Sequence, residues 1–150
     1  MSEKKPIRLF VTHTFQDSED YARVFEYLQS RDNFFYTNYS DPNIQADMGQ
    51  EALEEAIRQQ MKLVEVVIFP VAMHRENPKV IDFELKVAKA HKLPVLGIEA
   101  FGSTISIPKA LLEQATETVS WNDREITDLV QKLARGESDA KWDVIEFDMD

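Results

Sequence analysis

Apolar residues follow two different spacings along this chain. Short, mostly apolar runs bounded by polar residues predict five strands, at residues 7–11, 34–37, 64–71, 94–98 and 118–121. Between these runs, apolar residues return at every third or fourth position. This spacing predicts helices that include residues 21–28, 53–61, 79–92 and 123–135, and a short helix at 109–114. Strands and helices therefore alternate up to Gly136.

This alternation predicts a three-layer α/β fold, in which helices cover both faces of an open, mainly parallel sheet. Since crossovers between parallel strands are right-handed, we expect five strands in the order 2-1-3-4-5. Ligands of such sheets bind beyond the carboxyl ends of the strands, where the strand order reverses. The loops at residues 12–17, 39–50 and 72–79 are expected at that edge.

Glu84 falls on the apolar side of the helix expected at residues 79–92. A carboxyl group there must be paired, protonated or exposed to a cleft, because burial of an unpaired charge is costly. One interpretation is a carboxylate at the floor of a crevice, in contact with a ribose or a developing cation. The other is a structural glutamate that favours the positive end of the helix or pairs with Lys92 or Arg75.

Several loop residues are further candidates for chemistry. His13 and His74 each follow a strand, where a histidine can exchange protons, although a solvated loop histidine is the more common case. Phe15, Tyr39 and Phe101 fall in loops beside the expected ligand edge, so their rings could stack on a base or a nicotinamide.

Two loop acids have ordinary structural interpretations. Asp17 can cap the first helix, a position that Ser18 can also take, and Asp41 followed by proline is typical of a turn. The three histidines of the chain are not spaced as a metal site, and no phosphate-binding glycine loop or nucleophile motif is present. No metal and no cofactor is therefore expected.

Composition narrows the class of protein. The chain has 150 residues, 43% of them hydrophobic, which predicts one domain over residues 1–136. Its net charge of −10, without a basic stripe, argues against nucleic acid as a partner. No apolar stretch is long enough to cross a membrane, no secretion signal is evident, and cysteine is absent, so a cytoplasmic location is expected.

Residues 137–150 form a separate, acidic tail with apolar residues. Six acidic residues stand there against one lysine. A purely solvated tail would not need apolar side chains. We therefore expect docking of this tail on the domain or on a neighbouring copy, with a disordered terminus as the alternative. The apolar side chains concerned are Trp142, Val144, Ile145 and Phe147.

Four segments, in order, resemble a Toll/interleukin-1 receptor (TIR)-like domain, in the short prokaryotic branch related to TIR proteins of Thoeris anti-phage defence. Residues 8–17 (RLFVTHTFQD) resemble the opening strand and polar loop of that family. Residues 38–42 (NYSDP) resemble the start of its second loop. Residues 83–98 resemble its glutamate-bearing helix and the next strand, and residues 119–122 (VSWN) the end of its last strand. The resemblance covers roughly residues 7–135.

The resemblance implies a flavodoxin-like fold and, in active members, cleavage of the nicotinamide–ribose bond of NAD. Glu84 would be the catalytic glutamate. Where the family usually has tryptophan, four residues before the glutamate, this chain has Val80, so an aromatic wall would be missing. The residues that would line the nucleotide crevice are Thr12, His13, Phe15, Asp17, Tyr39, Ser40, Asp41 and Val80.

The sequence is compatible with three functions. The leading one is a prokaryotic TIR-like signalling or defence enzyme that converts NAD to ADP-ribose or to a cyclic ADP-ribose-type signal. The second is a non-catalytic TIR-like assembly module that binds protein partners or copies of itself. The third is an enzyme similar to nucleoside deoxyribosyltransferases, which share the sheet type and use a carboxylate nucleophile.

Overall fold

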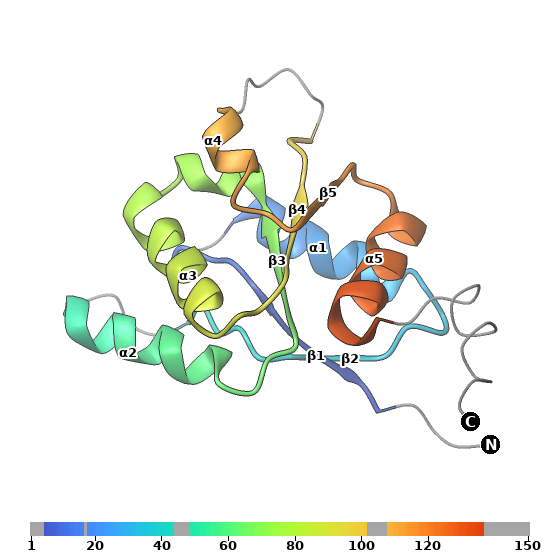
Figure 1. The fold of residues 1–150 in the computed structure, drawn as a ribbon, viewed down its shortest axis with the longest axis horizontal. Helices are drawn as coiled ribbons and strands as arrows, with labels where there is room; N and C mark the ends of the chain where they lie inside the picture. Colours follow the sequence, from blue (N-terminus) through green and yellow to red (C-terminus); the bar gives the residue numbers. More distant parts are fainter. Residues whose placement is uncertain (1–4, 17, 44–48, 102–107, 137–150) are drawn as a thin grey trace.

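The computed structural model describes residues 5–16, 18–43, 49–101 and 108–136 (Figure 1). Five strands form one sheet in the order β2-β1-β3-β4-β5, and every neighbouring pair is parallel. This confirms the predicted sheet type and strand order. The strands are β1 (Ile7–Val11), β2 (Tyr36–Asn38), β3 (Val66–Pro70), β4 (Val95–Ile98) and β5 (Glu117–Val119).

Helices cover both faces of the sheet, as predicted (Figure 1). On one face α1 and α5 pack against the strands, and on the other α2 and α3 do so, with side chains of α4 at the same side. A 3-10 helix, η2, connects β3 to α3. The helices are α1 (Glu19–Gln29), α2 (Gln50–Met61), η2 (Val71–Arg75), α3 (Pro78–Ala90), α4 (Lys109–Leu112) and α5 (Asp123–Arg135).

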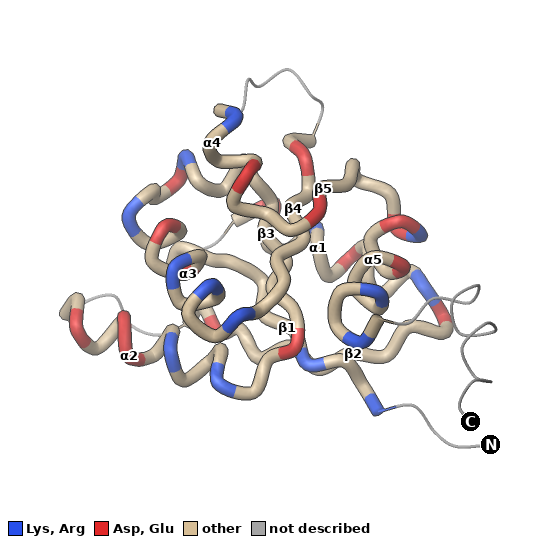
Figure 2. Tube along the Cα trace, in the orientation of Figure 1, with Lys and Arg blue, Asp and Glu red and all other residues tan. Residues whose placement is uncertain are grey.

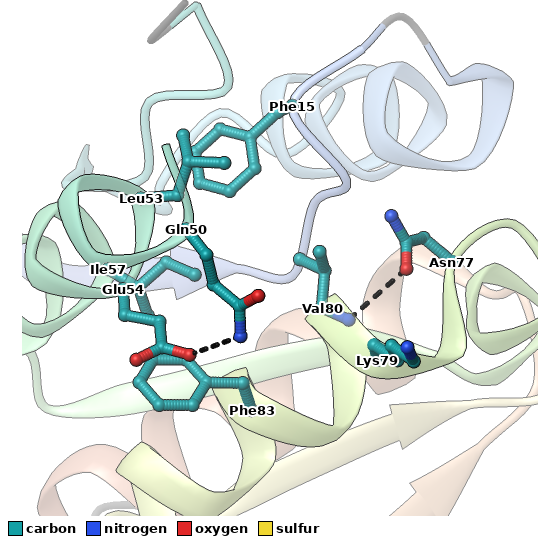
Figure 3. Close-up of a pocket in the computed structure, with 9 residues that line it drawn as sticks. All are labelled: Phe15, Gln50, Leu53, Glu54, Ile57, Asn77, Lys79, Val80 and Phe83. Carbon is teal, nitrogen blue, oxygen red and sulfur yellow. Dashed lines mark hydrogen bonds between the residues drawn. The ribbon is translucent and has the colours of Figure 1, made fainter. Parts of the chain in front are cut away.

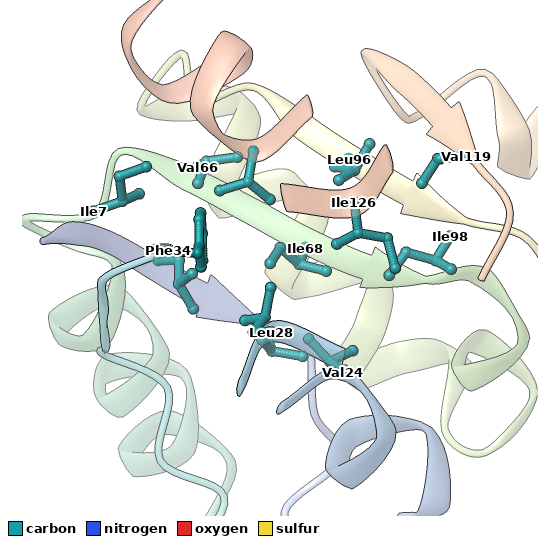
Figure 4. Packing of buried hydrophobic residues seen from close by; sticks show 13 residues of the cluster. Ile7, Val24, Leu28, Phe34, Val66, Ile68, Leu96, Ile98, Val119 and Ile126 are labelled. Atoms are coloured by element: carbon teal, nitrogen blue, oxygen red, sulfur yellow. The ribbon is translucent and has the colours of Figure 1, made fainter. Parts of the chain in front are cut away.

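Strand β3 is the centre of the core, and all five of its residues are buried. Val66 and Ile68 point toward α1 and α5, where Leu28 and Ile126 meet them (Figure 4). The intervening Val67 and Phe69 belong to the cluster on the α2 and α3 face. A strand buried on both faces needs apolar residues at every position, which explains its unbroken apolar run.

Polar caps fix where the helices near the sheet edge begin. Ser18 accepts a hydrogen bond from the backbone of Tyr21, so Ser18 rather than Asp17 is the observed cap of α1. Asn77 caps α3 in the same way through the Val80 N–H, and Pro78 takes the first helical position. The start of α3 is thus set by local sequence, which in turn orients Val80 and the residues that follow.

Three predicted strand boundaries move by about two residues. Strand β2 begins at Tyr36 rather than at residue 34, because the N–H of Phe34 closes a turn on the Arg31 carbonyl. Strand β3 runs over Val66–Pro70 rather than over residues 64–71. It ends at Pro70 because the chain then enters the 3-10 helix η2. Strand β5 ends at Val119, so Trp121 lies beyond it. Strand ends are the least determined part of an apolar pattern.

The sequence also predicts that the chain has no basic stripe and no membrane-spanning stretch and that its acidic tail docks. On α2 the acidic residues precede the single arginine, and on α3 Asp82 stands between Lys79 and Lys86 (Figure 2). Among the residues that the structure describes, no helix combines the length and apolar character needed to cross a membrane. Residues 137–150 lie outside the described part, so the docking of the acidic tail stays a prediction.

Candidate functional site

The strand order reverses between β1 and β3, and Glu84 lies at this switch point. The chain leaves β1 through the first loop (residues 12–18), and α3 brings Glu84 against it. The N–H of His13 donates to Glu84 Oε1 at 3.0 Å. The Glu84 side chain is completely buried, whereas Arg75 and Lys92 are exposed. The partner of Glu84 is therefore His13, and pairing with Arg75 or Lys92 does not occur.

Burial favours the neutral forms of both Glu84 and His13. Loss of solvent raises the pKa of Glu84 well above its ordinary value, and the hydrogen bond from the His13 N–H only partly opposes this. Loss of solvent also lowers the pKa of His13 to about 4, against the opposing effects of Gln60 and Asp41. His13 is therefore neutral at pH 7, and the 3.8 Å contact between its Nδ1 and Glu84 Oε2 is not an ion pair.

Gln60 on α2 connects this pair to the second loop (residues 39–49). Its Oε1 lies 3.1 Å from His13 Nε2 and accepts a hydrogen bond from the Asp41 N–H at 2.8 Å. Its Nε2 donates to the Asp41 carbonyl at 3.2 Å. Residues from the first loop, α2, α3 and the second loop are thus joined in one hydrogen-bonded group.

Other contacts hold the loops together at the same edge of the sheet. Glu76 lies between η2 and α3, in the third loop expected from the sequence, and accepts from Ser18 Oγ at 3.1 Å and from Thr14 Oγ1 at 3.5 Å. The Tyr21 hydroxyl lies 2.9 Å from Ser40 Oγ, which links α1 to the second loop. The first and third loops therefore contact each other, and the second loop is tied to the same edge through α1 and through Gln60.

A cavity of about 280 Å³ opens between α2 and α3, beside the buried pair (Figure 3). Its walls are mainly apolar, and Val80 contributes from the helical turn that precedes Glu84. Glu84 has no exposed surface, so the expectation that it opens into a cleft does not hold in this conformation. The cavity is lined by Phe15, Gln50, Leu53, Glu54, Ile57, Asn77, Lys79, Val80 and Phe83.

Phe15 stands between the cavity and the buried pair. It lines the cavity, and its ring meets the His13 ring edge-on with 4.7 Å between the centroids. Its φ of 61° lies in the left-handed region, which a non-glycine residue adopts at some cost in energy. The backbone of the first loop is thus strained at the residue that separates the cavity from His13.

The structure brings some of the predicted site residues together and leaves others apart. His13 and Asp41 join Glu84 through hydrogen bonds, while Phe15 and Val80 reach the cavity. Thr12 is buried and directs its hydroxyl at the sulfur of Met73, 4.0 Å away.

Two predicted residues of the second loop face the protein rather than the cavity. Ser40 is buried and bonded to Tyr21, and Tyr39 packs half-buried against the apolar cluster on the α2 and α3 face. Asp17 lies outside the described residues.

Two other candidates are not part of this site. His74 Nε2 lies at hydrogen-bond distance, 2.9 Å, from Asp82 Oδ1. Phe101 lies under the Arg23 guanidinium, 4.0 Å from its ring centroid, and beside Trp121. In the described part of the chain no group of three histidine, aspartate or glutamate residues could hold a metal ion.

Sequence reasoning missed Gln60 and the aromatic wall provided by Phe83. Phe83 follows Val80 by three residues, and this helical spacing could have placed both on one wall. Gln60 follows Ala56 by four residues and Ile57 by three, so helical spacing could have placed it on the apolar face of α2, unlike the exposed Gln59. Its hydrogen-bond partners could not be found in this way, because they lie on distant segments.

The fold and the site define an α/β domain that buries a glutamate on the helix after its third strand. The model of the family described as Thoeris protein ThsB, TIR-like domain, matches residues 10–104, which include the end of β1, the three loops and Glu84. The chain belongs to this family, and it is a TIR-like defence or signalling protein. A comparison with curated proteins gave no match.

Proposed function

We propose that this protein cleaves the nicotinamide–ribose bond of NAD and that Glu84 is its catalytic residue. The observation that carries the proposal is a buried carboxyl group whose Oε2 has no hydrogen-bond partner among the described residues and which lies one helical turn from a cavity wall. A carboxyl group in such surroundings is a strong candidate for a functional site. Membership of the TIR-like family supports the same assignment.

The chemistry needs one carboxylate in a site that excludes water. Loss of nicotinamide builds positive charge on the ribose, as in the cleavage of glycosides. A fixed carboxylate stabilises that charge strongly where water is excluded. Nicotinamide leaves NAD without protonation because it departs from a cation as a neutral molecule. Capture of the ribose cation by water gives ADP-ribose, and capture by the adenine or a ribose hydroxyl of the same molecule gives a cyclic product.

Substrate must reach Glu84, and we place that opening at Phe15. A cavity of about 280 Å³ suits one planar ring of the substrate rather than the whole dinucleotide. Movement of the strained Phe15 away from His13 would extend the cavity toward Glu84. The positive charge of the bound nicotinamide ring, which passes to the ribose as the bond breaks, would then favour the ionised form of Glu84.

The test is release of nicotinamide from NAD at high protein concentration, comparing the parent with Glu84→Gln. The substitution keeps the side-chain shape and removes the charge, so we expect turnover to fall about 100-fold or more. Glu55→Gln makes the same change on the exposed face of α2 and should retain the parent rate. Equal turnover in the parent and Glu84→Gln would rule out the catalytic assignment.

A non-catalytic assembly module is the second candidate, and the complete burial of Glu84 is the observation that favours it. In that case Glu84 would serve the packing of α3 against the first loop. The parent would then release no nicotinamide at any protein concentration. Sedimentation would show self-association or binding of a partner, with or without NAD present.

Replacement of Val80 by tryptophan is expected to strengthen substrate binding. Val80 lines the cavity at the position where the resemblance places a tryptophan. An added aromatic face should stack on a base, so the KM for NAD should fall about tenfold in Val80→Trp. Val80→Leu adds apolar volume without a ring and serves as the control. An unchanged KM in Val80→Trp would place the substrate ring elsewhere.

A further inference from the structure

Backbone groups fix the orientation of the Gln60 side chain. The Asp41 N–H donates to Gln60 Oε1, and the Asp41 carbonyl accepts from Gln60 Nε2. A backbone N–H can only donate and a carbonyl can only accept. The amide of Gln60 therefore cannot be turned around while Asp41 stays in place, and its oxygen must face His13.

This orientation determines which nitrogen of His13 carries the proton. Gln60 Oε1 lies 3.1 Å from His13 Nε2 and has no hydrogen to offer, so Nε2 must be the donor. In the neutral ring, Nδ1 then keeps an unshared electron pair. Nδ1 lies 3.8 Å from Glu84 Oε2, and both atoms are buried without a hydrogen-bond partner among the described residues.

We propose that Gln60 and His13 are positioning residues that hold Glu84 as a carboxylic acid, with the Oε2 hydroxyl directed at His13 Nδ1. The two oxygens of Glu84 then differ in role. Oε1 is the carbonyl oxygen that accepts the His13 N–H, and Oε2 is the hydroxyl. An ionised Glu84 would instead place a negative oxygen against the electron pair of Nδ1, which is unfavourable.

The surroundings of the pair support this proton arrangement. Burial raises the pKa of Glu84 and lowers the pKa of His13, so both groups favour their neutral forms. Two other titratable side chains face His13 among the described residues. Tyr21 of α1 has its ring centroid 6.2 Å away, and Asp41 of the second loop, by its charge, weakly favours a protonated imidazole.

The arrangement makes the ionisation of Glu84 depend on the second loop. If Asp41 moves away, the Gln60 amide is free to turn and present its NH₂ group to His13 Nε2. The Glu84 proton then passes from Oε2 to Nδ1, and the Nε2 proton leaves to solvent. His13 stays neutral and donates to an ionised Glu84. The effect of this change on turnover rests on the proposed function, since the ionised glutamate would stabilise a positive ribose.

The test measures proton positions directly, through the ¹⁵N resonances of His13 and the ¹³C carboxyl resonance of Glu84, assigned with Glu84→Gln. In the parent at pH 7 we expect the Nε2–H form of His13 and a protonated Glu84. In Gln60→Leu the acceptor is lost, so Nδ1–H should gain population. The midpoint of the Glu84 titration should then fall by about one pH unit or more.

Gln59→Leu makes the same change one residue away, on an exposed side chain, and should behave as the parent does. Gln60→Met keeps the side-chain length and replaces Gln60→Leu if the latter does not fold. The proposal is overturned if the parent holds His13 as the Nδ1–H form or Glu84 as an ion at pH 7. It is also overturned if the Gln60 variant titrates as the parent does. These readouts need no NAD, so absence of NAD cleavage would refute the proposed function alone.

Discussion

Glu84→Gln is expected to gain stability relative to the parent as the pH rises above about 4.5. In the parent, burial raises the pKa of Glu84 above the value of 4.5 that it has in an unfolded chain. The folded state therefore binds this proton more tightly, unfolding releases it, and stability falls with rising pH. The fall is at most about 1.4 kcal/mol per pH unit and ends at the folded-state pKa. The variant lacks this loss.

Chemical denaturation of the parent and Glu84→Gln at a series of pH values measures the effect, because other titrating groups cancel in the difference. Glu55→Gln removes an exposed carboxyl group from α2 and should not show the gain. A difference between Glu84→Gln and the parent that stays constant from pH 5 to pH 8 would mean that Glu84 is not protonated in the folded state.

His13→Phe is expected to lose less stability in acid than the parent. In the parent, burial lowers the pKa of His13 from 6.5 to about 4, so the unfolded chain takes up a proton that the folded protein refuses. The stabilisation from this residue is complete above pH 6.5 and is lost as the pH falls toward 4. The difference between these two pKa values corresponds to a contribution of about 3 kcal/mol to the free energy of unfolding. Phenylalanine fills the ring position without titrating.

The measurement is the free energy of unfolding at pH 7 and at pH 4.5, by denaturation in urea. His13→Phe should have the lower stability at pH 7, since the Gln60 oxygen loses its hydrogen bond from the ring. Between pH 7 and pH 4.5, His13→Phe should lose less free energy of unfolding than the parent does. His91→Phe changes an exposed histidine at the end of α3 and should follow the parent. Equal acid losses in parent and His13→Phe would place a charged His13 in the folded protein.

Between about pH 4.5 and 6.5 the two buried groups act in opposite directions. Stability from His13 increases with pH, whereas stability from Glu84 decreases, so in the parent each trend opposes the other. Each single variant removes one of the two opposing trends. Replacement of one member therefore makes the effect of the other on the pH dependence of stability easier to measure.

Local signals in the sequence were sufficient for the fold and for the most unusual residue. The unbroken apolar run around β3 predicted a strand buried on both faces, and the helical spacing of α3 placed Glu84 on the apolar side. Asn122 and Gly136 marked the ends of α5, where the structure shows a side-chain cap and a left-handed φ of 68°. These features depend on residues a few positions apart, which is why the sequence alone specifies them.

Tertiary structure alone decided what surrounds Glu84. Its partner, His13, is 71 positions away, and Gln60 approaches His13 from a third segment. No periodic pattern encodes such contacts, because hydrogen bonds between distant segments depend on how helices settle against the sheet. The same packing seals Glu84 and places Phe15 and Phe83 around the neighbouring cavity. The sequence by itself thus determined that a carboxyl group is buried on α3, and the packing of α2 and the first loop determined its hydrogen-bond partners.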